Sequence, residues 1–248
     1  MIKFFRKIRQ TLIHENRFSK YLLYALGEIM LVVIGILIAL QINNWNEDRK
    51  QDQRVKQNYH QILEDLEREK NYATFIIDKF EGQRKAYQEY LDGFSTSQIT
   101  REAMLHELLQ LNMEGFPINS NSSFIESLHN SGEIALVPEK IRNRLIDLRR
   151  RQQKIIVDEG LDNRARMGII ERVSMLIGTK DLEKRIESQA ELRAALNLGE
   201  NTNQIILGLE AIHDWMDFSE SKSIRHLKEL VTEIEEVESL IMQELESK

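Results

Sequence analysis

The sequence predicts an all-α protein: a single N-terminal transmembrane helix followed by an extracytoplasmic helical bundle with a long, stalk-like first helix. Three observations favour this class. The 248 residues include only two prolines and 11 glycines, so few residues interrupt long helices. Apolar side chains recur every three or four residues over most of the chain. One further stretch is continuously apolar over the thickness of a bilayer.

Residues 1–20 form a basic segment that we expect in the cytoplasm. Six lysines and arginines stand here against the single acid Glu15, whereas the whole chain carries a net charge of −6. Apolar residues at helical spacing (Phe4, Phe5, Ile8 and Leu12) predict an amphipathic helix on an anionic membrane surface, and an unstructured basic tail is the alternative. The acidic remainder of the chain argues against nucleic acid as a partner, because phosphate binding requires clustered cations.

Residues 21–43 are predicted to form the transmembrane helix. From Leu22 to Ile42 the only strongly polar side chains are Glu28 and Gln41. At ~1.5 Å per residue this stretch spans about 31 Å, which matches a bilayer core of about 30 Å. A cleaved signal peptide is the main alternative. However, no small-x-small cleavage site follows before Glu47, so we expect an uncleaved anchor in contact with the lipid bilayer.

Charges on the two flanks predict the orientation. Six cations precede the span, and four follow it before residue 61: Arg49, Lys50, Arg54 and Lys56. Because cytoplasmic flanks carry the excess of lysine and arginine, we expect a cytoplasmic N-terminus in a bacterial inner membrane. Residues 44–248 would then form a periplasmic helical domain.

One face of the predicted anchor carries Glu28, Gly35 and Ala39. An acid within a membrane span is costly, so it is a functional hypothesis by default, although its position near one end also permits simple tolerance. Gly35 and Ala39 form a small-x-x-x-small pattern that lets a second helix approach closely. This face predicts a homo-oligomer or a membrane-protein partner.

The N-terminal sequence resembles a known family. The stretch MIKFFRKIRQTLIHENRFSKYLLYALGEIMLVVIGILIALQINNWNEDRK is similar to the N-terminus of an uncharacterised single-pass membrane protein family of Bacteroidota, and SLHNSGEIALVPEKIRNRL (residues 127–145) is a looser match. The resemblance implies an envelope location and no established activity.

The helices behind the anchor are predicted from apolar periodicity and from residues that begin or end helices. An apolar stripe from Val55 to Leu91 predicts the long first helix, which Asp92 and Gly93 end. Thr100 is expected to cap a second helix that runs to Asn112, and a loop follows over residues 115–122. The remaining helices are expected at 123–131, from Pro138 to 177, and at 181–196, 203–218 and 223–245, with the last helix antiparallel to the first.

One constellation of residues suggests metal chemistry. Two Glu-x-x-His motifs, Glu126–His129 and Glu210–His213, match the spacing by which ferritin-like bundles hold a di-metal centre. With six histidines in a glutamate-rich chain, about one such match arises by chance, so no catalytic, cofactor-binding or metal residue is assigned. The favoured hypothesis is a non-enzymatic interaction, scaffold or ligand-sensing bundle, and the di-metal bundle enzyme is the alternative.

Overall fold

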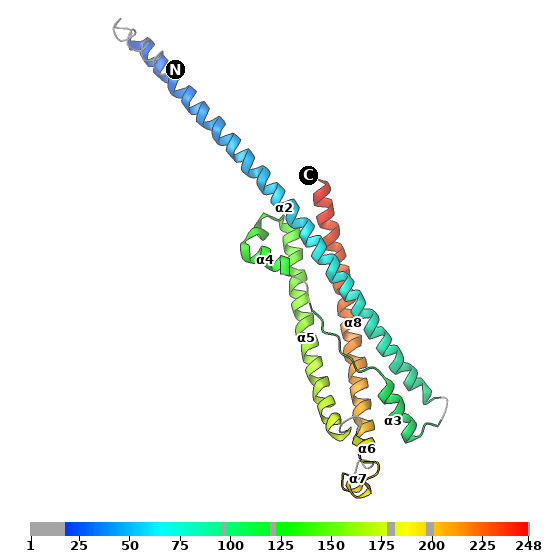
Figure 1. Cartoon of the computed structure of the whole chain (residues 1–248). Helices are drawn as coiled ribbons and strands as arrows, with labels where there is room; N and C mark the ends of the chain where they lie inside the picture. Colours follow the sequence, from blue (N-terminus) through cyan, green and yellow to red (C-terminus); the bar gives the residue numbers. More distant parts are fainter. Residues whose placement is uncertain (1–17, 96–97, 120–122, 178–181, 197–200, 248) are drawn as a thin grey trace. The chain divides into compact units, whose positions relative to one another are not determined.

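The computed structural model describes residues 18–95, 98–119, 123–177, 182–196 and 201–247, and every regular element within these ranges is a helix (Figure 1). The predicted all-α class is therefore confirmed. The chain divides into two units, Met1–Gln57 and Asn58–Lys248. Most of the predicted amphipathic segment, up to residue 17, lies outside the described residues.

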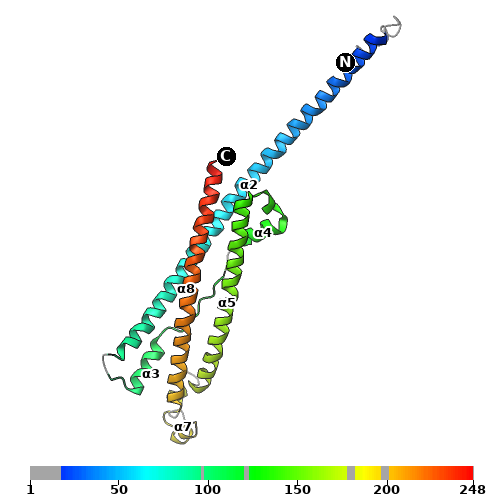
Figure 2. The same ribbon diagram turned by 180° about the vertical axis from the view of Figure 1, so that it is seen from behind.

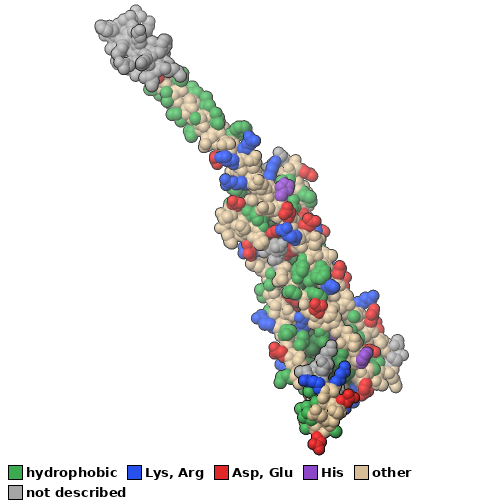
Figure 3. Space-filling view, in the orientation of Figure 1, with side chains coloured by type: hydrophobic (Ala, Val, Ile, Leu, Met, Phe, Trp, Pro, Cys, Tyr) green, Lys and Arg blue, Asp and Glu red, His purple; other side chains and the backbone are tan. Residues whose placement is uncertain are grey.

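The first unit is dominated by the apolar part of helix α2, which runs without interruption from Phe18 to Gly93. Its large hydrophobic side chains between Leu22 and Ile42 are all 47–76% exposed. Figure 3 shows this apolar surface next to the mixed charges that follow it. By length and composition, this part of α2 could cross a membrane.

The second unit is built on three long helices: α2 from Asn58 onward, α5 (Glu139–Ile177) and α8 (Thr202–Glu246). Side-chain contacts show that α8 is antiparallel to both of the others. On α2, Lys70 contacts Glu238 and Glu81 contacts Lys228. On α5, Arg151 contacts Glu229 and Glu159 contacts Ser223. Figures 1 and 2 show α5 and α8 side by side from opposite directions. The predicted antiparallel packing of the first and last helices is confirmed.

The prediction of two helices in place of α8 was wrong. The serine-rich stretch between residues 218 and 223 does not break the chain into two helices, because it lies within one helix of 45 residues. Ser219 donates its hydroxyl to the backbone carbonyl of Met216, and Ser223 donates to Glu159 on α5. These bonds satisfy the buried hydroxyls inside the helix, so the serines need not end it.

The other predicted boundaries agree with the structure to within a few residues. Helix α3 (Arg101–Gln110) begins after Thr100, whose hydroxyl accepts from the backbone N–H of Ala103 as a capping residue does. Helix α4 (Ser123–Ser131) ends at Gly132, whose φ of 79° favours glycine. A 3₁₀ turn, η1 (Glu133–Leu136), then leads to α5, and Pro138 caps α5 from the position before its first residue.

Two predictions differ in detail from the structure. The helix expected over residues 181–196 is two short helices, α6 (Leu182–Arg185) and α7 (Ala190–Leu196), because the chain turns after Arg185 and buries Ile186. On α2 the predicted stripe is buried from Tyr59 to Tyr87, but Leu91 is exposed and Tyr90 is buried in its place. The drift of a 3.6-residue period over so many turns explains this shift by one residue.

Residues 111–119 form an extended segment, called the strap here, that lies along α2. The Gln83 side chain donates to the carbonyl of Glu114, and the Tyr72 hydroxyl donates to that of Pro117. Between these bonds Phe116 makes edge contacts with Phe75 and Phe80. Ile118 on the strap is buried. The predicted loop is therefore packed against the bundle rather than solvated.

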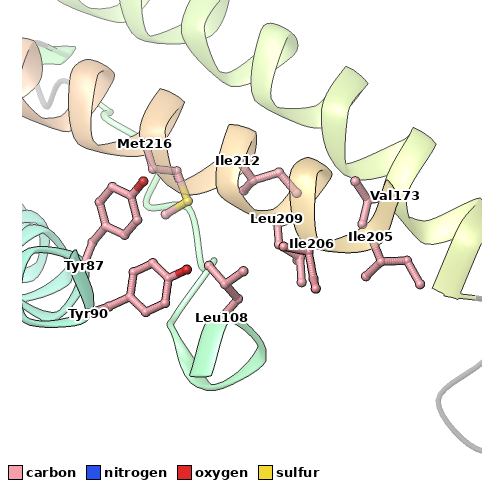
Figure 4. Close-up of a cluster of buried hydrophobic side chains, with 9 residues drawn as sticks. All are labelled: Tyr87, Tyr90, Leu108, Val173, Ile205, Ile206, Leu209, Ile212 and Met216. Carbon is pink, nitrogen blue, oxygen red and sulfur yellow. The ribbon is translucent and has the colours of Figure 1, made fainter. Parts of the chain in front are cut away.

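Gly208 on α8 packs tightly against Val173 of α5, a member of the apolar cluster shown in Figure 4. The space that a Cβ of residue 208 would occupy is filled by a methyl group of Val173. Valine has little rotamer freedom in a helix, so it cannot turn aside cheaply. A glycine in the middle of this helix is therefore explained by packing.

Replacing Gly208 with alanine should destabilise the bundle by about 1–2 kcal/mol, because overpacking outweighs the gain in helix propensity. Gly160→Ala is the matched control, since no atom lies within 4 Å of the Cβ position of Gly160. It should stabilise by about 0.5–1 kcal/mol. Chemical denaturation measures both, and equal effects of the two changes would contradict the close packing at Gly208.

Candidate functional site

The bundle interior contains a layer of polar side chains between the apolar clusters, and this layer is the candidate functional site. It is centred on His213 and Glu220 of α8, which are 3% and 4% exposed. Buried ionisable side chains cost free energy unless they are paired, so such a layer in a helical core calls for an explanation. Side chains of α2, α5 and the strap complete it.

At one end of the layer, two tyrosines of α2 share one carboxylate of α8. The hydroxyls of Tyr87 and Tyr90 both donate to Glu210, and the Tyr87 ring stacks on His213 with 5.6 Å between ring centroids. Figure 4 shows both tyrosine rings extending from α2 towards α8. Burial, together with Glu210, raises the pKa of both hydroxyls, so the tyrosines act as permanent hydrogen-bond donors.

His213 is a neutral imidazole in this setting. Burial lowers the pKa of its ring, against the opposing effects of its hydrogen bond to the Leu108 backbone and of Glu210. The bond to Leu108 ties α3 to the centre of the bundle. Among the described residues, Nε2 of His213 has no hydrogen-bond partner.

A small cavity of about 10 Å³ joins this end of the layer to Glu220. That volume is close to the least that holds one water molecule. The cavity is bordered by residues of α2, α8 and the strap: Gln83, Arg84, Tyr87, Leu111, Asn112, His213, Met216, Asp217 and Glu220. Within the described chain, Oε1 of Gln83 and Oε1 of Glu220 also lack hydrogen-bond partners. The cavity is therefore bordered by three polar atoms without a protein partner among the described residues, on Gln83, His213 and Glu220.

Glu220 is the most perturbed acid of the layer. Burial raises its pKa to about 8, and Asp217 and Glu159 add to that shift, while Arg166 and Arg84 oppose it. Arg84 is already engaged, because its Nε lies 2.9 Å from Oδ1 of Asp217. Glu220 is therefore protonated at neutral pH.

A neighbouring acid on α5 is held in a similar way. Burial is also the main cause that raises the pKa of Glu159, whose carboxylate accepts from the Ser223 hydroxyl at 2.7 Å. Asp162, one turn further on, pairs with Lys222. The layer thus contains acids with a polar partner, Glu159 and Asp162, and one acid with an oxygen that is unpaired in the described chain, Glu220.

The two Glu-x-x-His motifs do not meet. Glu126 lies on α4 and pairs with Arg149 at 3.2 Å, close to where the backbone of Phe124 donates to Asp65. Glu210 instead contacts Tyr87, which is 22 residues further along α2, or roughly 33 Å. Two motifs so far apart cannot bind one metal pair. Within the described residues, no group of three His, Asp or Glu side chains is arranged to hold a metal ion.

The other sequence-selected residues lie elsewhere. Gly35 and Ala39 are on the exposed apolar part of α2, and no atom lies within 4 Å of the Cβ position of Gly35. Glu28 lies on the same helix segment and is half-buried. None of them belongs to the polar layer.

Sequence reasoning missed Glu220, although a signal for it was present. Its position continues the core spacing of α8, four residues after Met216 and seven before Leu227, both of which are buried. An acid at a core position of an amphipathic helix predicts a buried, perturbed carboxyl. The presumed break at the serines hid this register.

A family model described as a family of unknown function, DUF6090, matches residues 28–161, which is more than half of the chain. The chain belongs to this family. The matched region contains the sequence GEIALVPEKIRNRL and extends well past the N-terminal 50 residues on which the resemblance was strongest. The expectation of a family without an established activity is confirmed. Neither the curated proteins nor the solved structures include a match to this chain.

The family match covers only part of the polar layer. Gln83, Arg84, Tyr87 and the strap lie within it, whereas His213 and Glu220 lie beyond its end. The DUF6090 region therefore supplies the α2 and strap side of the cavity, and α8 supplies the ionisable core.

Glu220→Gln should change how stability depends on pH. Between the ordinary pKa of 4.5 and the folded value of about 8, the folded state keeps a proton that the unfolded state releases. Stability conferred by this group therefore falls as pH rises through that window. Relative to the wild type, the variant should gain about 2–8 °C in Tm between pH 5 and 8.5, measured by circular dichroism. A difference that stays constant with pH would show that Glu220 titrates normally.

Proposed function

We propose that this DUF6090 protein is anchored in a bacterial inner membrane by one helix and that its helical bundle is an interaction or sensing module on the periplasmic side. The observation that carries the proposal is the exposed apolar surface of α2 between Leu22 and Ile42. The bundle, in contrast, buries its own apolar stripes. Water is a poor solvent for the exposed apolar surface of residues 22–42, whereas it solvates the polar outer surface of the bundle well.

Lipid explains the exposed surface better than a second protein does. Fourteen large apolar side chains point outward around the whole helix rather than on one stripe. Burying each of them in an apolar medium stabilises by roughly 1.5–3 kcal/mol when complete. A helix that is apolar on all sides is typical of a membrane span, whereas a protein partner requires only one apolar face.

The flanking charges support a cytoplasmic N-terminus. Six lysines and arginines precede the span, whereas four follow it closely, two of them near acids such as Glu47, which pairs with Lys50 at 3.1 Å. The excess on the N-terminal side favours retention of that side in the cytoplasm. The acidic bundle would then face the periplasm.

An interaction role for the bundle is supported by apolar side chains that its core does not use. Leu207 and Phe218 on α8 are 69% and 60% exposed, and Val157 and Leu161 on α5 are 60% and 53% exposed. Phe218 contacts Trp215, whose indole donates to the Asp162 carbonyl. Exposed apolar side chains that gather into one patch mark interaction sites, and we propose this role for these residues.

Anchoring is tested by alkaline extraction of membranes from expressing cells. The wild type should remain in the membrane pellet. Ile34→Arg combined with Leu37→Arg should move most of the protein to the supernatant, because each arginine costs about 2.5–3.5 kcal/mol near the centre of a span. Ile34→Leu with Leu37→Ile is the control and should behave like the wild type. Release of the wild type by alkali would refute the anchor.

Association through the anchor is a second part of the proposal. Gly35 and Ala39 leave room for another helix to approach, so Gly35→Leu should lower the self-association of the span in a membrane two-hybrid assay by at least several-fold. Ile36→Leu, one position away on a different face, is the control and should have no effect. Equal signals from both variants would argue for a monomeric span.

A further inference from the structure

We infer that Glu220 and Arg166 form a proton-controlled latch on the strap: loss of a proton from Glu220 draws Arg166 inward and loosens the strap at Gly115. This inference concerns the bundle and does not depend on the membrane anchor. It rests on the contact between Arg166 and the strap and on the buried atoms of Arg166 and Glu220 that are unpaired within the described chain.

Arg166 packs directly against the strap. The space where Gly115 would carry a Cβ is filled by the guanidinium group of Arg166. A side chain at position 115 would have to displace that group. The backbone of the strap and the end of the arginine side chain on α5 are therefore in direct contact.

Glu220 is buried and Arg166 is half-buried, and each holds a buried hydrogen-bonding atom that is unused. Among the described residues, Oε1 of Glu220 and Nε of Arg166 have no partner, while a terminal nitrogen of Arg166 donates to Asn163. A buried charge without a partner is strongly unfavourable. When Glu220 is neutral, the two groups need not meet.

Ionisation changes this balance because Arg166 is the partner best able to respond. Of the nearby charges, Arg166 acts most strongly on Glu220. The second cation, Arg84, is held by Asp217. The titratable and charged groups around Glu220 come from each helix packed there: Arg84 on α2, Glu159, Asp162 and Arg166 on α5, and His213, Asp217 and Lys222 on α8. The strap's own residues at the cavity, Leu111 and Asn112, are uncharged.

A shift of Arg166 towards Glu220 removes the support under Gly115. The strap would then rely on the bonds from Gln83 and Tyr72 and on the Phe116 contacts. Gln83 also borders the cavity, so it responds to the same change. The expected result is local loosening around Glu114 with the long helices intact.

The absence of cysteine makes a direct test simple. A nitroxide on Glu114→Cys in the full chain, held in detergent micelles, reports strap mobility by electron paramagnetic resonance from pH 6 to 9.5. The mobile fraction should rise at least two-fold with a midpoint near pH 8. A label on Glu89→Cys, which is exposed on α2, should not respond. Circular dichroism should show unchanged helix content over this range.

The latch is assigned by adding Glu220→Gln to the labelled chain, which should keep the strap label immobile throughout. Glu235→Gln makes the same chemical change at an exposed position of α8 and should leave the transition intact. A wild-type label that shows no transition would overturn the latch, whether or not any variant folds. A transition that persists in Glu220→Gln would also overturn it, because another group would then control the strap.

Discussion

Everything in the second unit depends on the packing of α8, a continuous 45-residue helix, against α2 and α5. Its apolar stripe supplies much of the core, from Ile205 to Ile241. Since α8 is antiparallel to both neighbours, each of its residues faces a defined residue position on α2 and on α5. A polar residue on its inner face finds its partners at those positions, as Ser223 does at Glu159 and Asp217 does at Arg84, whereas Glu220 keeps an oxygen that is unpaired among the described residues.

The interior polar layer gives the bundle a means of response to protonation. Apolar contacts hold the three long helices together whatever the pH, while the layer couples them through ionisable groups. The strap is a short segment that makes both apolar contacts, through Phe116, and polar contacts, through its backbone carbonyls. In this arrangement a change in protonation alters a local contact without unfolding the bundle, because the surrounding apolar clusters remain buried.

The sequence contained the information for the helices but not for all of their packing. The apolar period of α2, the Thr100 cap and the position of Pro138 follow from local physics, and the structure agrees with them. The continuity of α8 could not be read from Ser219 and Ser223, because their hydroxyls are satisfied by tertiary and backbone contacts. The strap was equally hidden, since Phe116 and Ile118 gain their partners only when α2 is in place. The separation of Glu126 from Glu210 is a tertiary property as well, because α4 packs near Asp65 of α2 whereas Glu210 of α8 contacts Tyr87.

The proposed topology places the bundle across a membrane from the basic N-terminal segment. Single cysteines introduced at Lys7 and at the exposed Gln153 of α5 test it directly, because the chain has none of its own. In spheroplasts, a membrane-impermeant maleimide should label the Gln153→Cys protein and should label Lys7→Cys only after lysis. Labelling of Lys7→Cys before lysis, with Gln153→Cys protected, would contradict this topology.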